Sequence, residues 1–158
     1  KMKRFLLVFS AILLASSIFA QSNNSIYNKY SGKQGVSSVY ISPSMFKMMK
    51  SLPEVEIYDD KDVHFEQIIK SFEGMYVIEV ENVALVKSMI SDVESMIAKG
   101  NLELLMEVKE SDETVRIYVE KEGDMFKKFI MLEREDDSAT FISIDAQMPQ
   151  EAVAELLK

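Results

Sequence analysis

The residues best suited to chemistry lie in one acidic stretch around the only histidine of the chain. The neighbours of His64 in this stretch are Asp59, Asp60, Asp62 and Glu66. A catalytic zinc site normally takes two imidazoles or a defined His/Glu set, which one histidine cannot supply. The aspartates lack the glycine and the distal glutamate of a calcium-binding loop. We therefore expect a solvated turn that leads into a helix, and no bound metal.

Other catalytic patterns are missing from the sequence. The five glycines are isolated, so there is no glycine-rich phosphate loop, and the histidine has no Gly-x-Ser-x-Gly partner for serine hydrolysis. The chain has no cysteine, which excludes disulfides, thiol catalysis and cysteine-bound metals. A glycosidase-like pair of carboxylates stays open as an alternative, but acids are so plentiful that they carry little information. We expect no catalytic residue and no cofactor.

The first twenty residues have the composition of a secretory signal peptide. Lys1, Lys3 and Arg4 form a basic start, and an apolar run follows from Phe5 to Leu14. The small Ala20 stands before the expected cleavage point, and the run is shorter than the ~20 residues that span a bilayer. We expect a periplasmic or secreted protein. Without a cysteine for lipidation, no stable membrane anchor is expected after cleavage.

The net charge argues against nucleic acid and anionic membranes as partners. The formal charge is −8, and it becomes −11 once the three basic residues of the signal peptide are removed. Phosphate contacts need clustered lysines and arginines, to which so acidic a chain is poorly suited. Solubility is the simplest role for this charge.

The remaining chain is predicted to be a flexible leader followed by one domain. Residues 21–35 are polar and rich in serine, asparagine and glycine, which is typical of a leader, and residues 36–158 form the domain. A short strand is expected at 36–41, after which Ser42 caps a helix that begins at Pro43. A second short helix is expected to end at Gly74 with a left-handed cap.

The clearest helix follows Asn82 and ends at Gly100. Its apolar side chains fall on one arc of about 140°: Leu85, Val86, Met89, Ile90, Val93, Met96 and Ile97. A strand is expected before this helix at 75–81, and four strands after it at 102–109, 115–119, 125–134 and 139–146, with a last helix from Pro149. Their short polar turns predict an antiparallel meander. The predicted fold class is α+β: a mostly antiparallel sheet, made of this meander and one or two N-terminal strands, with helices mainly on one face.

One face of this sheet is a candidate partner surface. If Val115, Ile117 and Val119 face the helices, the alternating residues of the same strand point away. The predicted surface then consists of Leu105, Arg116, Tyr118, Phe129, Met131 and Phe141. Such a partly apolar face is either covered within the fold or used for contact with another molecule. A slip of one residue in register would exchange the two faces.

A second candidate position lies in the last predicted turn. Asp137, Ser138 and Ala139 match a short bacterial O-glycosylation pattern, and the turn is expected to be exposed. The alternative is a plain turn, because this tripeptide is common by chance.

Several segments carry a resemblance to known proteins. They are Val39–Phe46, Ile68–Glu81, Glu122–Leu132 and Phe141–Ile144, together with the signal-like start. Over roughly residues 36–158 the chain resembles domain of unknown function 4252, a family of bacterial envelope proteins found mainly in Bacteroidota. Many members look like lipoproteins, whereas this chain lacks the cysteine, which implies a soluble periplasmic form. The resemblance implies no activity and no functional residues, but it suggests a link to sigma/anti-sigma signalling.

The leading functional hypothesis is a non-enzymatic, exported binding or regulatory module of the cell envelope. Its partner would be an unidentified envelope protein or a second copy of the chain. A small secreted hydrolase that uses carboxylates is the alternative from another class, and a carrier of an apolar ligand is the third.

Overall fold

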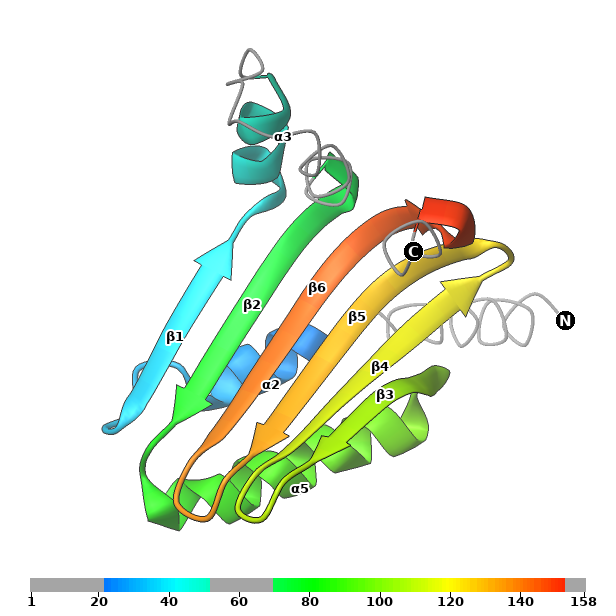
Figure 1. Ribbon diagram of the computed structural model, residues 1–158. Coiled ribbons are helices and arrows are strands. Elements are labelled where there is room, and N and C mark those ends of the chain that lie inside the picture. The colour runs from blue at the N-terminus through cyan, green and yellow to red at the C-terminus, as the bar shows by residue number, and fades with distance from the viewer. Residues whose placement is uncertain (1–21, 52–69, 153–158) are drawn as a thin grey trace, which may run out of the picture.

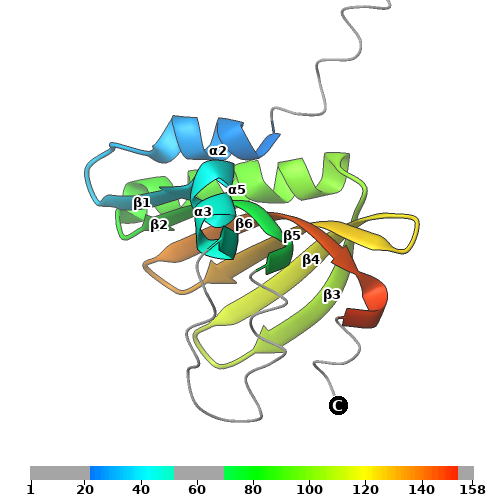
Figure 2. The same ribbon diagram turned by 90° about the horizontal axis from the view of Figure 1, so that it is seen from above.

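The computed structural model describes residues 22–51 and 70–152, which form a sheet with two helices on one side and a third helix at the end of two strands (Figures 1 and 2). The helices are α2 (Ser22–Tyr30), α3 (Pro43–Ser51) and α5 (Val83–Lys99). The strands are β1 (Val36–Ile41), β2 (Phe72–Val80), β3 (Leu102–Lys109), β4 (Thr114–Glu122), β5 (Met125–Arg134) and β6 (Ala139–Pro149).

The six strands form one antiparallel sheet in the order β1-β2-β6-β5-β4-β3. Strands β3 to β6 pair consecutively, which confirms the predicted meander. The last strand of the meander, β6, lies beside β2, so the N-terminal pair completes the sheet. Helix α5 therefore carries the chain from β2 to the opposite edge, where β3 begins (Figure 1). The predicted α+β class is confirmed.

Helix α5 has the boundaries and the apolar side that its sequence predicts. The side chain of Asn82 accepts a hydrogen bond from the backbone N–H of Ala84, and the backbone N–H of Gly100 closes the last turn on Met96 and Ile97. Its buried residues pack against β2, β5 and β6 in the main core. Among the described residues, no helix is both long and apolar enough to cross a membrane.

The predicted flexible leader is wrong for most of its length, because α2 occupies it. Ile26 and Tyr30 of α2 are 4% and 1% exposed and belong to the main core. The Tyr30 hydroxyl donates a hydrogen bond to Asp92 Oδ2 at 2.5 Å and lies 2.9 Å from Ser88 Oγ, both on α5. A polar helix this short is stabilised mainly by such tertiary packing, which composition does not reveal.

Two further predictions, of a helix end at Gly74 and a helix start at Pro149, are wrong. Gly74 is not a left-handed helix cap but lies inside β2, and the predicted helix before it falls mostly outside the described residues. Pro149 is the last residue of β6 and not the first residue of a helix; helical conformation begins after it, at Gln150. Residues 1–20, with the predicted signal peptide, and the acidic stretch around His64 also lie outside the described residues.

Candidate interaction surface

The two faces of the sheet are both apolar, but they have different surroundings. One face carries α2 and α5, and we call it the helix face. The opposite face, which looks toward the viewer in Figure 1, is called the open face because α2 and α5 both lie behind the sheet. The strands contribute six buried apolar residues to the main core on the helix face: Ile78, Val80, Ile130, Leu132, Ala139 and Phe141.

The open face carries a continuous apolar row across all six strands. Side chains on one face of a sheet lie opposite each other wherever their residues are paired, so the register identifies the row. In sheet order, this central row is Val39, Val77, Ile142, Met131, Ile117 and Met106. The four inner residues are half-buried, while Val39 and Met106 at the edges are 49% and 47% exposed.

A second apolar row runs beside the central row. It consists of Ile41, Met75, Ile144, Phe129 and Val119. Val119, the last residue of this row, also packs with Phe126 and Met148 in a small separate core. Phe72, Phe129 and Ala152 pack against that core. This end of the open face is therefore partly covered by the chain itself, whereas the central row belongs to neither core cluster of residues 22–51 and 70–152.

The predicted partner surface does not form a single surface in the structure. Phe129 and Met131 do lie on the open face. The placement of Arg116, Tyr118 and Phe141 is wrong, because these three residues lie on the helix face. Phe141 is fully buried and Tyr118 packs against the main core.

The physical reason for this error is that β4 carries apolar residues in both alternating positions. Val115, Ile117 and Val119 were expected to face the helices, but the register places them on the open face. The even-numbered set faces the helices instead, since Tyr118 is paired with the buried Ile130. Alternation alone could not choose between the two faces.

Arg116 takes part in ion pairs at the border of the helix face. Its Nε donates a hydrogen bond to Glu107 Oε2 at 2.6 Å, and its Nη1 lies 3.9 Å from Glu94 Oε1 on α5. The hydrogen bond to Glu107 raises the pKa of Arg116, while partial burial acts in the opposite direction. Its close ion pair thus links β4 to the edge strand β3.

Leu105 lies on the edge strand β3, where the pairing with β4 is irregular. The register shifts between Leu104 and Met106, and Leu105 itself is 49% exposed. A bulge of this kind is a common protection of an edge strand against unwanted pairing. Leu105 is thus accessible, but its partner role stays a prediction.

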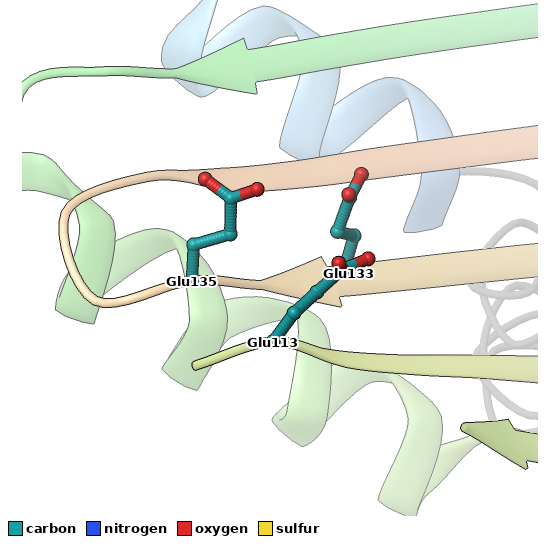
Figure 3. A group of neighbouring side chains, drawn as sticks. All are labelled: Glu113, Glu133 and Glu135. Atoms are coloured by element: carbon teal, nitrogen blue, oxygen red, sulfur yellow. The ribbon is translucent and has the colours of Figure 1, made fainter. Parts of the chain in front are cut away.

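Carboxylates gather at one end of the open face, as Figure 3 shows. Glu113 precedes β4, Glu133 lies near the end of β5, and Glu135 follows β5. One carboxylate oxygen from each of the three lies within 4.8 Å of the others. Glu79 of β2 belongs to the same row of the sheet as Glu133, with Thr140 between them. We call the four glutamates the acidic rim.

The acidic rim lacks basic partners in the part of the chain that the structure describes. Within residues 22–51 and 70–152, none of its four carboxylates forms an ion pair with a lysine or arginine. Desolvation raises the pKa of Glu113, and a hydrogen bond and charge repulsion from Glu133 raise it further. Like charges that are close together disfavour ionisation, so the rim would be stabilised by a cation or a basic side chain.

Ser138, the predicted glycosylation position, lies in the turn between β5 and β6. Its hydroxyl donates a hydrogen bond to Glu135 Oε2 at 2.6 Å, and its backbone carbonyl accepts one from the N–H of Glu135. The side chain is half-buried and takes part in the local structure of the turn. Its modification stays a prediction.

Ser143 places a buried polar group on the helix face. The residue is fully buried, and its hydroxyl has no hydrogen-bond partner among residues 22–51 and 70–152. Burying an unpaired hydroxyl costs free energy, so an apolar side chain of the same size should be tolerated here.

The comparisons with known proteins identify the family of the chain. Residues 30–156 match the family described as Domain of unknown function (DUF4252), and the chain belongs to it. The resemblance to this family, noted from the sequence, is thereby confirmed. No curated protein matches the sequence.

The sequence reasoning missed most of the residues that make up this surface. Val77, Ile142 and Ile144 were not singled out, although each lies at an apolar position of a predicted strand. The acidic rim was also missed, because its members come together only through strand pairing. The sequence feature that could have revealed the rim is the position of Glu113 and Glu135, which lie beside two turns at the same end of an antiparallel meander.

Proposed function

We propose that the chain is an exported, non-enzymatic interaction module of the cell envelope, and that its open face binds an apolar segment of another protein. The observation that carries the proposal is the central row, six apolar side chains aligned across every strand of the sheet. A contiguous apolar patch of this kind is typical of a contact surface when the fold itself does not cover it.

The opposite face of the sheet, the helix face, already binds the apolar side of a helix. The apolar side of α5 packs on the helix face, with Val86, Met89 and Val93 buried there. A sheet that is apolar on both faces is normally covered on both. The module would complete its second layer with a segment supplied by the partner.

The proposal can be tested by site-specific photo-crosslinking in the native host. A photoreactive phenylalanine analogue is placed at Met131 on the open face or at Lys87, an exposed position of α5. We expect one discrete adduct with another protein from position 131, no such adduct from position 87, and loss of the adduct on adding Ile142→Asp. A crosslink from position 131 to residues 52–69 of the same chain, or to a second copy, would overturn the proposal.

The export part of the proposal has its own test. N-terminal sequencing of the protein recovered from the envelope fraction should begin at Gln21. Recovery from the cytoplasm with residues 1–20 still attached would contradict it.

A further inference from the structure

The shape and backbone chemistry of the open face favour a helix as its occupant. The face presents side chains, and a lone strand lying on it would leave its backbone groups without hydrogen-bond partners. A helix satisfies its own backbone, as α5 does on the opposite face. Six strands about 4.8 Å apart span roughly 24 Å, which a helix of about 16 residues would cross.

The negative charge of the acidic rim indicates which side chains should border the apolar stripe of that helix. The acidic rim lies along one end of the strands, beside the central row that the helix would cover. Its carboxylates have no basic partner in the described part of the chain. A helix lying across the strands would bring one long border of its apolar stripe next to these carboxylates.

We infer that the open face binds an amphipathic helix of another protein, whose apolar stripe is bordered on one side by lysines or arginines. This inference rests on the proposed function and specifies the chemistry of the partner. The apolar stripe would supply most of the affinity, while the basic border would set orientation and specificity.

The test uses the full-length protein and two synthetic 16-residue amphipathic peptides labelled with a fluorescent dye. Both carry the same leucine stripe; one has three lysines along one border and the other has glutamates there. We expect the lysine peptide to bind about ten-fold more tightly in fluorescence anisotropy at low salt. The difference should shrink at about 0.5 M salt, because screening weakens exposed charge pairs.

Protein variants separate the inference from the proposed function. Replacing Glu113, Glu133 and Glu135 by glutamine should remove the preference for the lysine peptide. The control Glu122→Gln, at the last residue of β4, should leave it unchanged. Met131→Asp should weaken both peptides.

The outcomes are distinguishable. Equal binding of both peptides to the wild-type protein, with loss of both in Met131→Asp, would overturn the inferred basic border and leave the proposed function standing. Binding of neither peptide, or binding that Met131→Asp does not weaken, would overturn both.

Discussion

The contact between α2 and α5 allows one prediction to be worked out in detail. Tyr30→Phe removes a hydroxyl that donates to Asp92 and lies within hydrogen-bonding distance of Ser88, while keeping the buried ring. A hydrogen bond to a charged group contributes about 1.5–3 kcal/mol. Because Lys29 still pairs with Asp92, the carboxylate keeps one partner, and we expect a loss of about 2 kcal/mol.

The loss should depend on pH. Burial alone would raise the pKa of Asp92, but hydrogen bonds from Lys29 and Tyr30 outweigh it and leave the pKa below its ordinary value of 3.8. The stabilisation is therefore present above that value and is lost as the pH falls through the lowered pKa. The cost of Tyr30→Phe should be largest near neutral pH and smaller in acid.

Urea unfolding of the full-length protein at pH 7 and pH 3 measures this cost. Asn28→Ala, at an exposed position of α2, is the control and should change stability by no more than about 0.5 kcal/mol. A Tyr30→Phe protein as stable as the control at pH 7 would refute the docking of α2 against α5.

Three further predictions concern single positions. Gly35→Ala should destabilise the protein more than Gly32→Ala, as measured by urea unfolding; both glycines have positive φ, but only at Gly35 would a Cβ lie 3.0 Å from Asn82. Ser143→Ala should be neutral or raise the melting temperature, because it removes a buried hydroxyl that has no partner in the described part of the chain. Glu113→Gln should stabilise the protein against urea at pH 7 and have no effect below the ordinary carboxyl range, since a raised pKa in the folded state means stability that is lost as the pH rises.

Much of the fold could be predicted because local signals and packing agree. The cap at Asn82 and the apolar arc of α5 determine one helix, and regular polar turns separate the strands of the meander. The remaining parts of the fold depend on tertiary contacts, which the local sequence does not reveal. The residues of α2 have a polar composition, and only the distant partners of Tyr30 on α5 make this segment part of the core.

The candidate site was only partly predictable for a related reason. Phe129 and Met131 were placed together correctly on one face, since they are two residues apart on one strand. Choosing which face the helices cover required the register between strands, and β4 gave no preference because Ile117 and Tyr118 are both suited to a core. The acidic rim depends on the same long-range pairing.

The most direct test of the central claim compares two adjacent residues on β5. Ile130 points into the main core and is 1% exposed, whereas Met131 lies on the open face. Ile130→Asp should cost at least about 3 kcal/mol in urea unfolding, because it buries an unpaired charge. Met131→Asp should cost about 1 kcal/mol or less in the isolated protein. An equally large cost at Met131 would show that the open face is an internal core, and would contradict its role as a partner surface.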